Sequence, residues 1–547
     1  MSKKPLKVPK SIDLTPQQIE ALLERVAERK LEEEDWAILG AMAETIVFLG
    51  QAMEHKSASI QRLLRMIFGV KTESTKNVLP HSEDTGDTGE DRVPPSAEDG
   101  DDHHPKEERK GHGRNGADTY TGAEKIFIAH PTLKPADQCP ACLEGKVYPM
   151  KKPGVILRVV GRAPLQAKVW ELEKFRCNLC GAIFTAQAPP EIGDEKYDET
   201  TGAIIPLLKY GNGFPFSRLA GFQEQCGIPC APSTQWEISE RTAYRIAHVY
   251  GALIHYGAQG QIIHNDDTMM RILSLMKQNN NEKESDNEEC SRTGIFTTGI
   301  LSINNGRKVA LFFTGHKHAG ENLYDLLQKR QSGIGPPIQM CDALPRNQPK
   351  EFQIILAHCL AHARRKFVEV SFAFPDGCKH VIETLSQVYH YDALAKIQKM
   401  SDEERLSFHH KKSGPLMKNL NTWLHEQIEE KKVEPNSSMG SAIQYMLKYW
   451  EPLTLFLRVP KAPLDNNICE KALKKAILNR KNAYFYKTTH GAYIGDLFMS
   501  LIYTCNVANI NPFDYLIQLQ LHSHELMHNP DQWLPWNYQD TLSSLAK

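Results

Sequence analysis

Apolar and polar residues alternate with a period of two over several segments in the middle of the chain. Five segments have the alternation of strands, and they are residues 261–273, 295–303, 308–316, 336–343 and 352–359. The sequence Asn-Asn-Gly separates the second segment from the third and is typical of a hairpin turn. Residues 320–330, between the third and the fourth, have helical spacing. The pattern predicts three antiparallel strands, a helix, and two further strands that alternate with helices.

Helical spacing dominates the rest of the chain. We expect two or three amphipathic helices within residues 14–68, an all-helical insertion within residues 379–460, and a short helix that begins after the N-cap residues Asp465 and Asn466. Residues 198–245 predict three short helices with a glycine at the last turn. This pattern favours a helix-turn-helix that contacts DNA, although any three short helices could give it.

The composition predicts a soluble, intracellular protein of several domains. The chain has 547 residues, and no run approaches the ~18 consecutive apolar residues of a membrane span. The formal net charge of −1 hides an uneven distribution, because residues 81–102 carry nine acidic side chains and one basic side chain. This stretch has no apolar periodicity and predicts a disordered linker. The remainder of the chain is net positive, which is compatible with a nucleic-acid partner.

Four of the twelve cysteines form two Cys-x-x-Cys pairs. Cys139 and Cys142 make the first pair, Cys177 and Cys180 make the second, and a glycine follows each where the chain must turn tightly. Thiolates at this spacing are typical of a closed, structural zinc ribbon, and no further ligand indicates catalytic zinc. The alternative, two reduced thiol pairs without metal, would leave four clustered thiols with little core to bury them.

Three acidic residues fall where the predicted sheet would bring them together. Asp266 is in the middle of the first predicted strand, Asp342 is at the end of the fourth, and Glu470 is in the helix after Asp465. Three carboxylates at one point repel one another unless divalent cations bind, so this arrangement predicts a metal site. The alternatives are aspartates that keep edge strands soluble and, for Glu470, an exposed ion pair with Lys474.

Basic and polar side chains near two of these positions are predicted to contact DNA phosphates. They are Arg364, Arg365, Lys366, Lys471, Lys475, Arg480, Lys481 and Asn482. Of these, Arg480, Lys481 and Asn482 are expected to follow the short helix that begins after Asn466. Cys359 and His362 form a Cys-x-x-His pair that could bind metal. Because no second ligand pair lies nearby in the sequence, a structural or phosphate-orienting role is favoured for them.

Specific short motifs are spread over nearly the whole chain. They are R-M-I-F-G-V-K-T-E-S (65–74), the two cysteine pairs, L-L-K-Y-G-N-G-F-P-F-S-R (207–218), H-N-D-D-T (264–268), C-L-A-H-A-R-R-K-F (359–367), D-N-N-I-C-E (465–470), N-R-K-N (479–482) and N-I-N-P-F-D-Y-L (509–516). With these motifs the chain resembles transposases of the insertion sequence 66 family, which belong to the D-D-E class and have RNase H-like catalytic domains.

The resemblance implies which residues do the chemistry. It assigns Asp266, Asp342 and Glu470 as catalytic ligands of two Mg²⁺ or Mn²⁺ ions, with Zn²⁺ in a structural role. The family usually has Asp-Glu-Thr at the first carboxylate, whereas this chain has Asp267 in the second place, so the choice of ligand there stays open. Ala343 and Leu344 also replace the usual Gly-Tyr, but no carboxylate of the triad is lost.

The resemblance also implies partners and a location. We expect the protein to bind terminal inverted repeats and target DNA, to form a homo-oligomer in the synaptic complex, to use small accessory proteins encoded beside it, and to act at the nucleoid in the bacterial cytoplasm. It would cut DNA to expose 3′-hydroxyl ends and join them to the target. Two rivals remain open: a decayed transposase that only binds DNA, and a nuclease that cuts without joining.

The expected fold class is a multidomain α+β protein with an RNase H-like mixed sheet, an all-helical insertion, and helical, zinc-ribbon and helix-turn-helix modules before it. The expected division is a helical N-terminal region (1–78), an acidic and then basic disordered linker (79–125), a zinc ribbon (126–195), a helix-turn-helix-like module (196–255), the first part of the core (256–378), the helical insertion (379–460), the second part of the core with Glu470 (461–522), and a C-terminal tail (523–547).

Overall fold

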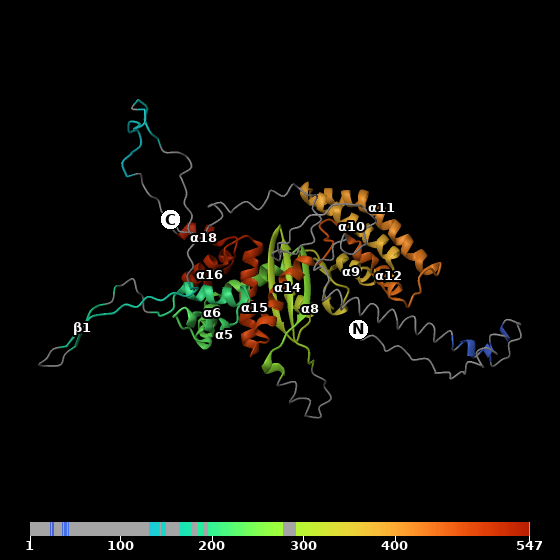
Figure 1. The fold of residues 1–547 in the computed structure, drawn as a ribbon, viewed down its shortest axis with the longest axis horizontal. Helices are drawn as coiled ribbons and strands as arrows, with labels where there is room; N and C mark the ends of the chain where they lie inside the picture. Colours follow the sequence, from blue (N-terminus) through green and yellow to red (C-terminus); the bar gives the residue numbers. More distant parts are fainter. Residues whose placement is uncertain are drawn as a thin grey trace, which may run out of the picture.

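A mixed sheet of five strands lies at the centre of the molecule, with helices packed around it (Figure 1). The computed structural model describes residues 131–142, 144–148, 163–176, 183–187, 189, 195–276 and 292–545, and among the first 130 residues only 22, 25–26, 35–36, 38–40 and 42. The predicted linker (79–125) and most of the predicted helical N-terminal region therefore lie outside the described residues, as do Cys177 and Cys180.

The described residues form seven strands, and the last five follow one another as the alternating pattern predicts. They are β1 (Lys174–Arg176), β2 (Ile183–Thr185), β3 (Ile262–Met269), β4 (Phe296–Asn304), β5 (Arg307–Gly315), β6 (Ile338–Cys341) and β7 (Ile355–His358). The order in the large sheet is β5-β4-β3-β6-β7, with β3, β4 and β5 antiparallel and with β6 and β7 parallel to β3. Asn305 and Gly306 have positive φ angles of 48° and 79°, which suit the predicted two-residue hairpin. The mixed α/β character of the prediction is confirmed.

Helices make up most of the remaining described chain. They are α4 (Glu199–Pro206), α5 (Phe216–Gln225), α6 (Pro232–Ala258), α8 (Ala319–Leu327), α9 (Leu360–Val370), α10 (Pro375–Ile397), α11 (Asp402–Glu429), α12 (Ser438–Lys448), α13 (Trp450–Leu453), α14 (Asn467–Ala483), α15 (Thr489–Val507), α16 (Pro512–Leu521), α17 (Ser523–His528) and α18 (Tyr538–Leu545), with a π-helix η3 (Leu207–Gly211) and 3₁₀ turns η4 (Pro345–Asn347), η5 (Leu455–Leu457) and η6 (Pro530–Trp533). Within the described residues, none of them combines the length and the apolar character that crossing a bilayer requires.

Two large hydrophobic cores and one smaller cluster, which joins α4, α5 and α6, hold these elements together. The larger core packs α6, α15 and α16 on the antiparallel strands through buried side chains such as Leu253, Phe312 and Phe498. The second core packs α9–α12 beside β6 and β7 through side chains such as Phe367 and Leu420. Figure 1 accordingly shows α9–α12 gathered on one side of the sheet and α5, α6 and α16 on the other. The sheet thus lies between two packed bodies of helices, with β3 near its middle.

The outer edge of β5 is covered by polar side chains of α15. The backbone N–H groups of Ala310, Phe312 and Thr314 donate to Thr504 Oγ1 (3.1 Å), to Ser500 Oγ (3.0 Å) and to an oxygen of Asp496 (2.7 Å). These three acceptors are spaced four residues apart and so lie on one face of α15. Burial raises the pKa of Asp496 to about 7. The side chains of α15 therefore accept hydrogen bonds from the edge strand β5, whose backbone N–H groups would otherwise be open to pairing with another strand.

The segment of residues 207–213 fixes the position of α14. Lys475 Nζ donates to Gly211 O (2.9 Å) and Asn482 Nδ2 donates to Gly213 O (2.8 Å). Lys209 Nζ donates to Asn479 Oδ1 of α14 at 3.1 Å. Burial lowers the pKa of Lys209 to about 8. Gly213 has a φ of 71°, and a β-carbon there would lie 2.7 Å from the Leu478 side chain, so only glycine suits this contact.

Candidate active site

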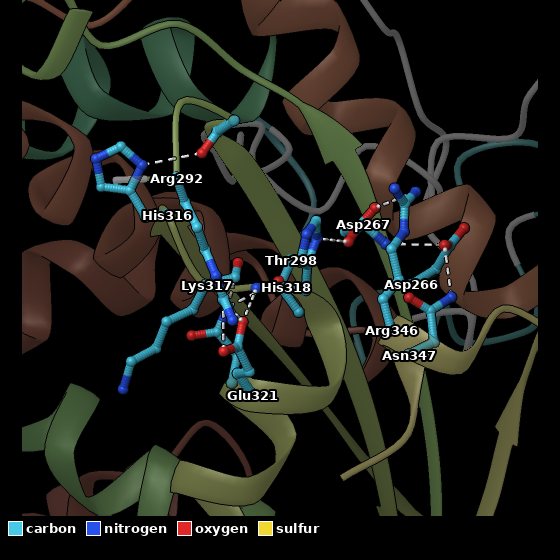
Figure 2. A network of polar contacts seen from close by, with 12 residues as sticks. Asp266, Asp267, Arg292, Thr298, His316, Lys317, His318, Glu321, Arg346 and Asn347 are labelled. Atoms are coloured by element: carbon cyan, nitrogen blue, oxygen red, sulfur yellow. Dashed lines mark hydrogen bonds and ion pairs between the residues drawn. The ribbon is translucent and has the colours of Figure 1, made fainter. Parts of the chain in front are cut away.

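Asp266 and Asp267 of β3 point to opposite faces of the sheet, as neighbours in a strand do. The carboxylate of Asp267 accepts from His318 Nδ1 at 3.1 Å and from Arg346 Nη2 at 3.0 Å (Figure 2). Its side chain is only 1% exposed. Asp267 is therefore engaged in two charged contacts, and Asp266 is the carboxylate of this pair that stays available on the other face.

Asp342 lies beside Asp266 because the strands that carry them are neighbours. β6 pairs in parallel with β3, and Asp342 follows directly after the last residue of β6. The side-chain amide of Asn347 spans the two carboxylates, since its Nδ2 lies 2.5 Å from Asp342 Oδ1 and 3.5 Å from Asp266 Oδ1. Figure 2 shows Asn347 directed at Asp266. Two acidic groups that are far apart in the sequence therefore share one hydrogen-bond donor.

Glu470 reaches the same region from α14. This helix packs on β3 and β4, and Cys469 Sγ donates to Gly299 O of β4 at 3.3 Å. Glu470 Oε1 is buried and has no hydrogen-bond partner, and His362 Nε2 lies 3.6 Å from it. A buried carboxylate oxygen without a donor is costly, so this position favours a bound cation.

The electrostatics link the three carboxylates. Burial and, after it, the negative charges of Asp342, Asp267 and Glu470 together raise the pKa of Asp266 to about 7. A group that is pushed toward its neutral form by neighbouring carboxylates returns to its charged form when a divalent cation binds between them. Because all the donors are carboxylate oxygens, the set suits a hard cation such as Mg²⁺ or Mn²⁺.

A buried polar network under the site ties α14 to β3. Asn466, which is fully buried at the N-terminus of α14, accepts from His264 Nδ1 at 3.0 Å and donates to Asn265 O at 3.2 Å. Asn265 in turn donates to Asn347 O at 2.7 Å. Burial lowers the pKa of His264 to about 4, so the imidazole is neutral and Nδ1 carries its proton for this bond. The network connects Asn466, one helical turn before Glu470, with Asn347, which donates to Asp342.

The predicted N-cap of α14 is therefore only partly right. Asn466 occupies the cap position, but its side chain bonds to β3 and not to the helix. Asp465 Oδ1 accepts from the backbone N–H of Asn467 at 3.1 Å instead. The helix also continues through Ala483, whereas the sequence predicted that it would end before Arg480.

The predicted phosphate contacts on α14 differ in their surroundings. Lys471 and Lys481 are exposed. Lys475 and Asn482 are bonded to the segment of residues 207–213, and Arg480 donates to Thr268 Oγ1 at 3.3 Å and to the carbonyl of Met269 at the end of β3. The structure thus gives three of the five positions a contact within the protein and leaves Lys471 and Lys481 open to solvent.

The second basic segment lies on α9. Arg364 is buried, with 9% of its surface exposed, and Arg365 is half-buried. Lys366 Nζ lies 4.3 Å from the centre of the Tyr445 ring of α12, a cation–π contact. The segment therefore packs against the helical insertion for part of its surface.

The first cysteine pair has the backbone geometry of a metal-binding knuckle. Cys142 Sγ accepts from the backbone N–H of Gly145 at 3.4 Å, and Cys139 N donates to Gly145 O at 2.7 Å. Hydrogen bonds from the backbone N–H groups of Glu144 and Gly145 lower the pKa of the Cys142 thiol. These features favour a thiolate ligand at Cys142. The predicted second pair, Cys177 and Cys180, lies outside the described residues.

Sequence reasoning missed the polar residues that support the carboxylates. Asn347 and Asn466 are separated from Asp266 by long stretches of chain, and only the pairing of β3 with β6 and the packing of α14 bring them together. Asn466 falls inside the motif D-N-N-I-C-E, which was a usable signal. Asn347 lies in a short turn without a recognisable pattern.

The fold and the site define an α/β protein whose central sheet carries a carboxylate cluster suited to divalent cations. The chain belongs to the IS66 family of transposases, because the family model described as "Transposase IS66 family" matches residues 196–494 and so includes all three carboxylates. Membership implies an enzyme that cuts and joins DNA. The match begins after Cys142, so it does not bear on the predicted zinc ribbon.

Proteins of Sinorhizobium fredii (strain NBRC 101917 / NGR234) are similar to most of the chain. "Uncharacterized protein y4hP" is 26% identical over 451 residues, which cover 76% of this chain and 75% of that protein. "Uncharacterized protein y4jD" is 23% identical over 503 residues, which cover 88% of this chain and 94% of that protein. The similarity to the second protein therefore extends well beyond the matched family region.

Proposed function

We propose that this protein is a D-D-E transposase with an RNase H-like core, in which Asp266, Asp342 and Glu470 hold two Mg²⁺ or Mn²⁺ ions. The observation that carries the proposal is the convergence of Asp266 and Asp342 on the amide of Asn347, with Glu470 near enough to raise the pKa of Asp266. The strand order, with three antiparallel strands followed by two parallel ones, supports the RNase H-like assignment.

The residues present fit the proposed ions. They offer carboxylate oxygens, they repel one another without a cation, and Glu470 Oε1 is buried without a donor. When bound, two such ions activate a water or a 3′-hydroxyl and stabilise the leaving oxygen of a phosphodiester. Asn347 holds the carboxylates of Asp266 and Asp342 in register, and Asn466 anchors the first turn of α14, which carries Glu470.

The proposed DNA path runs past the exposed face of α14. Lys471 and Lys481 are exposed on the helix that carries Glu470, so their ammonium groups can receive phosphates next to the cluster. We include Arg364, Arg365, Lys366, Lys475, Arg480 and Asn482 in this path as further DNA contacts, and the helical insertion as one wall of the channel.

The remaining modules would select and pair the DNA ends. Cys139, Cys142, Cys177 and Cys180 would hold a structural Zn²⁺, and residues 198–245 would bind the terminal repeats. In the structure this region forms α4, η3, α5 and the first half of α6, with Gly227 at a φ of 74° in the last turn. Two or more copies would pair the ends at the nucleoid, with small accessory proteins.

A cleavage and joining assay tests the proposal. We expect the purified full-length chain to cut a duplex that ends in the terminal repeat of its element, and to join the 3′ end to target DNA, in the presence of Mg²⁺ but not of EDTA. Glu470→Gln should slow both steps at least about 10³-fold, because it removes a ligand charge from the metal site. Glu525→Gln, at an exposed glutamate of α17, should leave both rates unchanged.

Each result that contradicts this expectation has a different meaning for the class of protein. A Glu470→Gln variant that cuts and joins as fast as the wild type would refute the triad. Cutting without joining would identify a nuclease. Binding of the terminal repeat without any metal-dependent cutting would identify a decayed transposase that acts only as a DNA-binding protein.

A further inference from the structure

Three side chains of different chemistry meet beside the carboxylate cluster. Cys359 is the N-cap residue of α9, His362 lies in the first turn of that helix, and Glu470 comes from α14. A sulfur, an imidazole nitrogen and a carboxylate oxygen from these residues all lie within 4.8 Å of one another. The sequence showed the Cys-x-x-His pair without a partner, and the packing of α14 supplies the third donor.

Two polar atoms of this group lack the hydrogen bonds that buried atoms normally have. His362 Nδ1 and Glu470 Oε1 are both buried and have no hydrogen-bond partner. Buried polar atoms in folded proteins are nearly always paired with protein, water or an ion. His362 Nε2 lies 3.6 Å from Glu470 Oε1, so a cation bound between these two residues would give Glu470 Oε1 the partner that it lacks.

The sulfur of Cys359 is surrounded as a metal-bound thiolate is. It accepts from the backbone N–H of Asn466 at 3.3 Å and also from the backbone N–H of His362. The N–H of Gly145 donates to the sulfur of Cys142 in the same way, in the predicted zinc knuckle. Burial and the charge of Asp465 raise the pKa of the Cys359 thiol to about 12, so a cation must displace its proton to bind there.

We propose that Cys359, His362 and Glu470 form a binding site for a borderline divalent cation of the Zn²⁺ class. A thiolate and an imidazole select such an ion over Mg²⁺, and three protein ligands leave a fourth position for water. Glu470 belongs to this site and also to the proposed catalytic triad. A Zn²⁺ ion at this site therefore withdraws Glu470 from Asp266 and Asp342 and inhibits the transposase. The inhibition rests on the proposed function, whereas the binding does not.

Titration with Co²⁺ alone tests the binding. The full-length chain would carry Cys139→Ser and Cys142→Ser, which disable the predicted zinc ribbon, and binding would be followed by the thiolate-to-Co²⁺ charge-transfer band in the near ultraviolet. We expect Cys359→Ser on this background to remove a band that corresponds to one Co²⁺ per chain. Cys378→Ser, at another fully buried thiol on α10, should leave that band unchanged. His362→Ala and Glu470→Gln should each weaken the binding at least about 100-fold.

The outcomes separate this site from the catalytic proposal. A charge-transfer band that Cys359→Ser does not change, or a Co²⁺ affinity that Glu470→Gln leaves intact, would overturn the site. If Cys359→Ser fails to fold, His362→Ala decides in its place, because the imidazole is a quarter exposed and its truncation disturbs little packing. The titration needs no DNA, so it can fail while metal-dependent cutting succeeds, and it can succeed on a chain that never cuts.

Discussion

Asp266→Asn will slow the cutting of terminal-repeat DNA at least about 10³-fold, whereas Asp267→Asn will stay within about 10-fold of the wild type. The two residues are neighbours on β3 and have the same chemistry, but they face opposite ways. Asp266 faces Asp342 and Glu470, and burial with their charges raises its pKa. Asp267 faces His318 and Arg346, so its replacement weakens an ion pair with Arg346 and a contact with His318, and it leaves the carboxylate cluster complete.

Cutting rates measured in Mg²⁺ for the two variants decide between the carboxylates. Asp267→Asn should lower the free energy of unfolding by about 1–3 kcal/mol, because His318 and Arg346 lose a charged partner that is almost fully buried. Its cutting should therefore be compared at a temperature at which both variants remain folded. The reverse order, with Asp267→Asn inactive and Asp266→Asn active, would place the metal ligand on the other face of β3.

Asn466→Ala will lower the free energy of unfolding by about 2–4 kcal/mol and will slow cutting about 10- to 100-fold in the molecules that stay folded. The change leaves His264 Nδ1 and the carbonyl of Asn265 without their partners in a fully buried position. It also frees the first turn of α14, so Glu470 is no longer held at a fixed distance from Asp266.

Asn467→Ala is the matched control for this prediction. Asn467 is the next residue, has the same side chain, and is exposed at the first position of α14. Its replacement should change the free energy of unfolding by no more than about 0.5 kcal/mol and should leave cutting unchanged. Urea unfolding and single-turnover cutting would measure the two effects. Equal effects at the two positions would contradict the anchoring role of Asn466.

Local patterns in the sequence were sufficient to predict the sheet. The alternation in residues 261–273 and 295–303 matches β3 and β4, and Asn305 and Gly306 form the predicted turn. The antiparallel pairing of β4 with β5 followed from the same local signals, because a two-residue turn joins antiparallel strands, and the helix between β5 and β6 allows a parallel return. That Asp266 and Asp342 lie side by side depends in addition on the pairing of β3 with β6, which came from the predicted arrangement of the whole sheet.

The residues that hold the carboxylates in place could not be predicted, because their roles depend on contacts between segments that are far apart in the sequence. Asn347 is in a turn whose sequence carries no signal, and its role appears only when β6 lies beside β3. The same holds for the Cys-x-x-His pair. Cys359 and His362 looked isolated in the sequence because their third donor, Glu470, is on a helix that follows the whole insertion.

The basic residues of α14 show a second limit of sequence reasoning. Charge near a carboxylate predicted phosphate contacts, but the pattern could not show that Lys475 and Asn482 bond to the segment of residues 207–213. The motif L-L-K-Y-G-N-G-F-P-F-S-R was visible in the sequence, and its role as a support for α14 emerges only from the packing. Of the predicted contacts on α14, Lys471 and Lys481 are the exposed ones.

The proposed metal site is tested most directly by anomalous diffraction from crystals of the full-length chain soaked in Mn²⁺. We expect Mn²⁺ bound by oxygens of Asp266 and Asp342, with Glu470 directed at the same ions and Asp267 still paired with His318 and Arg346. A crystal that shows no Mn²⁺ at these carboxylates, or that places it on Asp267, would contradict the proposed site.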